Sequence, residues 1–149
     1  MRDDALKMVF ELEQKREDEC ARDFGQARTQ LTMQERRLEG LTNYRTDYLQ
    51  QANSKAQQGI GSASFGHYHA FVGKLDVGIT QQQDNLKRMQ THVEELRLRW
   101  LAQQQRRKAL EYLLNKRVLA AERKRNSQEQ RTADEFAMQG FLRRAREGS

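Results

Sequence analysis

Few residues of this chain have the type and spacing that catalysis or metal binding requires. His67 and His69 are two residues apart, so on a helix they point to different faces, and no third ligand lies at metal-binding spacing. The Gly-rich residues 59–64 lack the Gly-Lys-Ser/Thr that completes a phosphate-binding loop. Cys20 is the only cysteine, and we expect it to be a small buried hydrophobe and not a nucleophile. These features predict a protein that is not an enzyme and has no metal or cofactor.

Charge is the stronger chemical signal, and it is unevenly distributed. The 149 residues include 27 Lys and Arg against 21 Asp and Glu, a net charge of +6. Residues 1–60 carry a net charge of −1 and residues 61–149 one of +7, with ten basic residues between positions 97 and 125. Such a surface could bind nucleic acid, anionic lipid or an acidic protein, or could be a solvated helix face. Apart from Trp100, which belongs to the apolar seam described below, only Tyr112 supplies an aromatic ring among these residues, so we do not expect nucleic acid as a partner.

Aromatic side chains gather on both sides of the Gly-rich segment. Tyr44 and Tyr48 are four residues apart, so they share one face of a helix. The residues that a turn would bring to the same end are Phe65, Tyr68, Phe71 and Leu75. Tyr44 falls outside the apolar seam described below, and it is the candidate for an exposed contact residue.

The composition indicates long, thin helices. Only 36% of the residues are hydrophobic, the mean hydropathy is −1.03, and there is no Pro. This is too little apolar surface for a thick core, but Gln, Leu, Ala, Arg and Glu dominate, and these are helix formers. No stretch is apolar enough for a signal peptide or a transmembrane helix, so we expect a cytoplasmic chain that does not insert into a membrane.

Apolar residues recur in steps of four and three on both sides of the turn, which is the pattern of a coiled coil. The first seam comprises Leu6, Phe10, Glu13, Glu17, Cys20, Phe24, Ala27, Leu31, Gln34, Leu38, Leu41, Arg45, Tyr48 and Ala52. The second comprises Phe71, Leu75, Ile79, Gln82, Leu86, Met89, Val93, Leu96, Trp100, Gln103, Arg107, Leu110, Leu114 and Val118. The two seams predict an all-α fold, a long antiparallel two-helix coiled-coil hairpin. We expect helices at about 4–57 and 66–139, a turn at about 58–65, and a single domain over residues 1–149.

A turn near residue 62 predicts the register of the hairpin. Facing residues then have numbers that sum to about 124, as Phe24 and Trp100 do. Glu17 would lie opposite Arg107, where a charged layer could fix the register. Residues 119–149 have no partner arm, so this overhang predicts either docking on another protein or a frayed tail.

Four stretches carry a resemblance to a known family. They are residues 41–48 (LTNYRTDY), 71–79 (FVGKLDVGI), 108–111 (KALE) and 134–137 (DEFA). In these stretches, and in length and turn position over almost the whole chain, the sequence resembles the FliJ family of the bacterial flagellar type III export apparatus. The resemblance implies a fold similar to the shaft coiled coil of rotary ATPase gamma subunits, with the end that bears both termini inserted into the hexameric export ATPase.

The resemblance also implies functions and sites. A family member would act as a stalk that promotes ring assembly and activity, binds the cytoplasmic domain of the export gate and escorts export chaperones. The gate-binding residues carried over by motif are Leu41, Tyr44, Tyr48, Phe71 and Leu75. The residues expected to contact the ring are Arg106, Arg107, Lys116, Arg117, Arg123, Lys124, Arg125 and Phe136.

The expected setting follows from the same resemblance. We expect a chain that is a monomer when free and peripherally associated with the inner membrane at the export apparatus. A stalk of another type III secretion system, a basic coiled-coil scaffold and a nucleic-acid-binding coil are the alternatives that the sequence leaves open.

Overall fold

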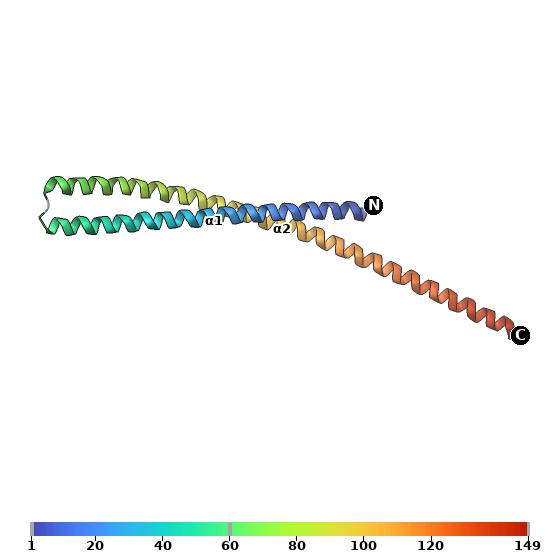
Figure 1. The fold of residues 1–149 in the computed structure, drawn as a ribbon. Helices are drawn as coiled ribbons and strands as arrows, with labels where there is room; N and C mark the ends of the chain where they lie inside the picture. The colour runs from blue at the N-terminus through green and yellow to red at the C-terminus, as the bar shows by residue number, and fades with distance from the viewer. Residues whose placement is uncertain (1, 60, 149) are drawn as a thin grey trace. The chain divides into compact units, whose positions relative to one another are not determined.

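Two long helices make up nearly all of the chain. The structure, a computed structural model, describes residues 2–59 and 61–148. Helix α1 spans Arg2–Gln57 and helix α2 spans Ser62–Glu147 (Figure 1). The two described ranges contain no strand. The all-α antiparallel hairpin predicted from the two seams is confirmed.

Helix α2 is longer than its seam suggested. It begins at Ser62, where the sequence predicted residue 66, and it continues to Glu147, where the sequence predicted residue 139. The added C-terminal turns are built of Phe, Leu, Arg and Ala around a single Gly140, and most of these residues tolerate or favour a helix. Residue 60 of the expected turn and residue 149 of the expected overhang lie outside the described residues.

Two glycines define the reversal of the chain. Gly59 has a φ of 86°, the left-handed conformation in which glycine commonly ends a helix. The backbone oxygen of Gly61 accepts hydrogen bonds from the amides of Ser64 at 3.1 Å and Phe65 at 3.3 Å, which start α2. The reversal therefore lies between the end of α1 at Gln57 and the start of α2 at Ser62.

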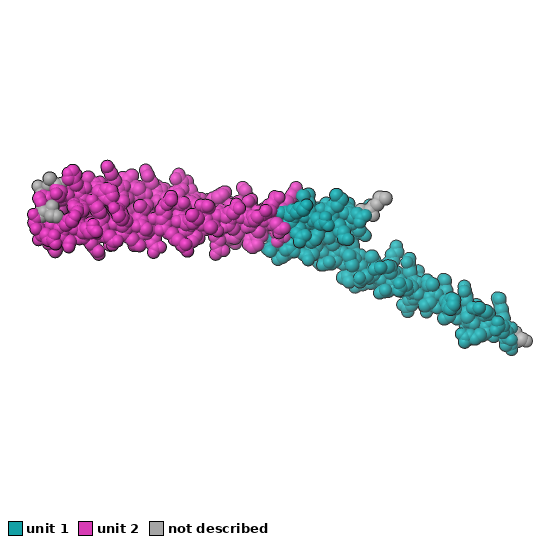
Figure 2. Space-filling view, in the orientation of Figure 1, with its two compact units in different colours: residues 1–15, 104–149 teal, residues 16–103 magenta. Residues whose placement is uncertain are grey.

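The described residues form two compact units (Figure 2). We call residues 16–103 the turn unit, because they contain the turn with the end of α1 and the start of α2. We call residues 2–15 and 104–148 the terminal unit. Each unit contains a part of both helices, and each carries one of the surfaces considered below.

The predicted seams are the least exposed parts of both helices. All fourteen seam positions of α1 and twelve of the fourteen of α2 are buried or half-buried. The two exceptions are Phe71 and Val118, both of which are exposed. The assignment of Phe71 to the seam is wrong because it required two successive steps of four. A step of three back from Leu75 leads to Val72, which is 7% exposed.

Two contacts inside the turn unit test the predicted register. The rings of Phe24 and Trp100 stack with centroids 5.7 Å apart, and these numbers sum to 124. The Nε2 of Gln82 donates a hydrogen bond to the Oε1 of Gln34 at 2.8 Å, and these numbers sum to 116. The predicted pairing of Phe24 with Trp100 is therefore confirmed, while the contact between Gln34 and Gln82 departs from the predicted sum by eight.

The seam predicts where substitutions destabilise the hairpin. Leu86 is 6% exposed and Leu98 is 53% exposed, and both lie on α2 in the turn unit. Leu86→Ala should lower the free energy of unfolding by about 2 to 4 kcal/mol, because it removes packed atoms from a core one layer thick. Leu98→Ala, the matched control, should change it by less than about 0.5 kcal/mol. Urea unfolding followed by far-ultraviolet circular dichroism measures both, and equal losses would contradict the assignment of the seam.

Candidate functional site

An aromatic cluster lies beside the turn. The ring centroid of Tyr48 lies 4.7 Å from that of Phe71, 4.9 Å from that of Tyr68 and 6.2 Å from that of Tyr44. These four residues, two from each helix, are called the tip cluster. Tyr48 is its centre and is half-buried. The cluster joins α1 to α2 because each helix supplies rings that the other covers.

Two polar contacts link the helices around the tip cluster. The Nζ of Lys55 donates a hydrogen bond to the hydroxyl of Tyr68 at 2.7 Å, and this bond raises the pKa of Lys55. The guanidinium of Arg45 pairs with Asp76 through both of its carboxylate oxygens, Nη2 to Oδ2 at 3.4 Å. The hydrogen bond that Arg45 donates to Asp76, with the attraction of the carboxylate charge, raises the pKa of Arg45. Each contact joins a residue of α1 to a residue of α2, so both help to fix the position of one helix along the other beside the cluster.

The five residues predicted for gate binding lie together but are not equally accessible. Leu41, Tyr48 and Leu75 are half-buried between the helices. Tyr44 is 51% exposed and Phe71 is 36% exposed. These last two rings meet edge to face, with centroids 6.2 Å apart and planes at 76°. The surface open to a partner is therefore the Tyr44 and Phe71 pair, with the other residues as its support.

The basic residues predicted for ring contact lie in the terminal unit, and two of them have partners within the chain. Arg107 is half-buried and donates a hydrogen bond from Nη1 to the Oε2 of Glu111 at 2.6 Å. The Nη1 of Arg117 lies 3.4 Å from the Oδ1 of Asp3, a contact between α2 and α1. The predicted basic residues that are exposed are Arg106, Lys116, Arg117, Arg123, Lys124 and Arg125. Arg107 is thus the least suited of the seven to contact another protein.

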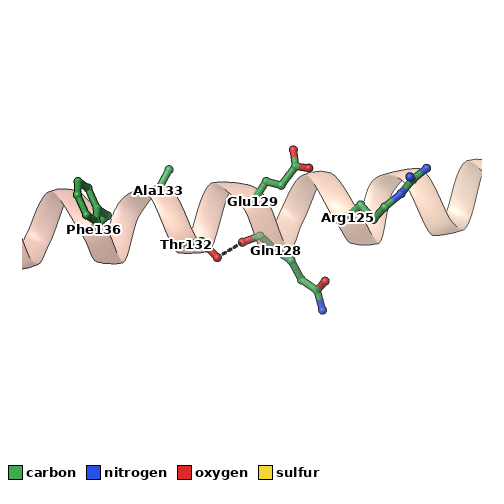
Figure 3. Close-up of a pocket in the computed structure, with 6 residues that line it drawn as sticks. All are labelled: Arg125, Gln128, Glu129, Thr132, Ala133 and Phe136. Carbon is green, nitrogen blue, oxygen red and sulfur yellow. Dashed lines mark hydrogen bonds between the residues drawn. The ribbon is translucent and has the colours of Figure 1, made fainter.

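A shallow hollow on α2 extends from Arg125, the last of the basic residues predicted for ring contact, to Phe136 (Figure 3). Phe136 is 73% exposed. Within the hollow, the Oγ1 of Thr132 donates a hydrogen bond to the backbone oxygen of Gln128 at 2.9 Å. The lining residues are Arg125, Gln128, Glu129, Thr132, Ala133 and Phe136. All of them come from one helix, so the hollow suits contact with a partner better than enclosure of a substrate.

Sequence reasoning missed an apolar strip at the start of α1. Met8, Val9 and Leu12 are exposed in the terminal unit. Met8 and Leu12 are four residues apart and so share a helix face, which was the available signal. The strip was missed because the heptad pattern assigns α1 only one apolar seam, and these residues lie beside it.

The described residues can also be examined for a metal site, a reactive cysteine and a membrane-spanning helix. No set of three or more His, Cys, Asp or Glu side chains there could hold a metal ion. Cys20 is free and half-buried. Over its described residues, neither helix has a stretch that is both long enough and apolar enough to span a bilayer.

Comparison with known proteins decides the family. The family model described as Flagellar FliJ protein matches residues 1–146. This chain belongs to the FliJ family. The FliJ-family chain is 29% identical over 140 residues to the Flagellar FliJ protein of Escherichia coli strain K12, covering 94% of this chain and 95% of that protein. It is 28% identical to the Flagellar FliJ protein of Salmonella typhi, with the same coverage.

No solved structure gives a significant match to this FliJ-family chain. Both relatives are named as flagellar proteins, and neither name is that of an enzyme. Family membership places the chain among the components of flagellar protein export. The resemblance carried by residues 41–48, 71–79, 108–111 and 134–137 suggested the same setting.

The tip cluster predicts different roles for its two tyrosines of α1. Tyr48→Ala removes three ring contacts and should lower the free energy of unfolding by about 2 kcal/mol, at about 0.5 to 1.5 kcal/mol for each aromatic pair. Tyr44→Ala removes two ring contacts from a position that is 51% exposed and should cost about 1 kcal/mol, the low end of the same range. Thermal unfolding followed by circular dichroism compares them. A larger loss for Tyr44→Ala would show that Tyr44, and not Tyr48, is the structural residue.

Proposed function

We propose that this chain is the central stalk of the flagellar export ATPase. In this role it promotes assembly and activity of the hexameric ring through the terminal unit and binds the cytoplasmic domain of the export gate through the tip cluster. Family membership supports this proposal, and so does the presence of two candidate surfaces on different units. Escort of export chaperones and peripheral association with the inner membrane complete the proposal on the strength of family membership.

The observation that carries the ring assignment is the uncovered part of α2. Every residue at positions 115–139 is exposed, although the helix continues without interruption. Lys116, Arg123 and Lys124 belong to this stretch, and Phe136 provides an apolar contact near its end. Because this part of α2 is not covered by α1, its side chains can contact the subunits of a surrounding ring. Unequal contacts with the subunits of a ring would bias them into different states without any chemistry in the stalk.

The gate assignment is supported by the exposed edge of the tip cluster. Tyr44 and Phe71 offer ring faces and edges to a partner while their own positions are fixed by packing on Tyr48. Aromatic side chains in such settings commonly supply much of the affinity of a small interface. Because the cluster lies wholly within the turn unit, substitutions there can affect gate binding alone.

The ring assignment predicts a specific loss of ATPase stimulation. The full chain, titrated into the export ATPase of the same organism, should give a saturable rise in turnover. A chain truncated after Ala120, and the full chain with Arg123→Gln, Lys124→Gln and Arg125→Gln, should lose most of this rise but still bind the gate domain. Arg36→Gln with Arg37→Gln, an exposed basic pair in the turn unit, is the matched control and should stimulate normally. Unchanged stimulation by the truncated chain would refute the assignment.

The gate assignment predicts a loss of gate binding without a loss of ATPase stimulation. Tyr44→Ala should weaken binding to the gate domain by about thirtyfold, as expected for a contact residue worth about 2 kcal/mol, and should leave ATPase stimulation unchanged. Tyr112→Ala removes another exposed tyrosine, in the terminal unit, and should leave gate binding unchanged. Isothermal titration calorimetry measures both. Equal weakening by the two variants would show that the tip cluster is not the gate surface.

A further inference from the structure

The last turns of α2 carry a second apolar face that the proposed stalk role does not use. Met138, Phe141 and Leu142 are 60%, 66% and 51% exposed. They are spaced three and four residues apart, and Ala145 continues the same line, so the four residues form one stripe along the helix. We call these four residues the C-terminal stripe. At 100° per residue, Phe136 lies on the opposite side of the helix, so the stripe and the hollow of Figure 3 are separate surfaces.

Arginines border the C-terminal stripe. Arg144 follows Phe141 by three residues on one side, and Arg146 follows Leu142 by four on the other. The Nε of Arg144 donates a hydrogen bond to the backbone oxygen of Gly140 at 3.4 Å, which holds this side chain close to the helix. Arg146 also has an interaction within the chain. Glu147, the acidic residue nearest the stripe's C-terminal end, projects from the opposite side of the helix by the same geometry.

An apolar stripe bordered by arginines matches the surface of an anionic bilayer. The apolar side chains can enter the boundary between headgroups and acyl chains, while the guanidinium groups stay with the phosphates. We propose that the end of α2, residues 138–147, lies in the plane of an anionic phospholipid surface. Such a helix rests on the membrane and does not cross it, which agrees with the result of the search for spanning helices in the described residues.

A second copy of the chain fits the stripe less well. Three large side chains that bury about 150 Å² each would give an interface near 900 Å² for two copies, below the roughly 1,000 Å² that specific interfaces need. The positions that would extend the stripe upstream by heptad spacing are Lys124, Gln128, Arg131 and Glu135, all of them polar. A coiled-coil pairing through this face could therefore not be prolonged.

Vesicle flotation with the full chain tests the proposal. The chain should bind vesicles of phosphatidylcholine with one quarter phosphatidylglycerol, should not bind phosphatidylcholine alone, and should bind less as salt increases. Replacing Arg143, Arg144 and Arg146 by Gln should weaken binding roughly 25-fold, at about fivefold for each of the two arginines that border the stripe. Arg143, on the far side of the helix, is included so that the variant loses the same charge as its control. Met138→Gln with Phe141→Gln should weaken it at least about tenfold while the helical content stays unchanged.

Two controls separate the stripe from general positive charge. The full chain with Arg123→Gln, Lys124→Gln and Arg125→Gln loses the same charge about 30 Å away along the helix and should bind nearly as well as the unchanged chain. A Phe141→Trp variant should show blue-shifted emission on adding anionic vesicles, above the background of Trp100, which is stacked on Phe24.

Three results would overturn the proposal. They are no flotation with anionic vesicles at low salt, equal loss for the two triple variants, and self-association by light scattering that Met138→Gln with Phe141→Gln abolishes. The last of these would assign the stripe to a second copy of the chain. None of these readouts depends on the export ATPase or the gate, so they test the stripe separately from the stalk.

Discussion

The fold depends on a single apolar seam that is only one layer thick. Two helices can bury one stripe each and nothing more, so the buried hydrophobic residues are few and no described large side chain is fully buried. Leu86 and Val72 are among the most enclosed. Stability must therefore accumulate along the length of the pair, layer by layer. Local contacts such as the Phe24 and Trp100 stack then matter for register more than for bulk burial.

The same constraint explains why binding surfaces arise where the seam stops. Past Leu114 the seam positions of α2 become polar or exposed, and the helix continues with nothing of α1 to cover it. Its remaining apolar residues no longer follow the seam, since Phe136 and the C-terminal stripe lie on opposite sides of the helix. At the other end, the turn leaves Tyr44 and Phe71 partly outside the pair. The hollow beside Phe136 is lined by one helix alone, so such outward faces are better suited to binding a partner than to enclosing a ligand.

Much of this fold could be predicted from sequence because heptad spacing is a local property. All fourteen predicted seam positions of α1 are shielded, and the turn glycines mark the reversal. The register is set less firmly by the sequence, because it depends on which glycine takes the left-handed conformation. The pairing of Phe24 with Trp100 could be predicted, but the contact between Gln34 and Gln82 could not. Phe71 was misplaced for a similar reason, since steps of three and of four from Leu75 both reach apolar residues. The hydrogen bond between Lys55 and Tyr68 has no sequence signal, because it joins residues 13 apart whose meeting depends on the turn.

Charge is partitioned along the chain in a way that follows from the seam. Where the helices pair, acidic and basic residues can offset one another, as Arg45 does with Asp76 and Arg117 with Asp3. Beyond the paired part of the helices, α2 has no α1 residues to neutralise Arg123, Lys124 and Arg125. Their positive potential can therefore attract a negatively charged partner. The overhang therefore differs from the hairpin in both respects that govern association, uncovered apolar side chains and unbalanced charge. A partner that binds it must supply negative charge and accept a narrow apolar face, and these two requirements together restrict the partner more than either does alone.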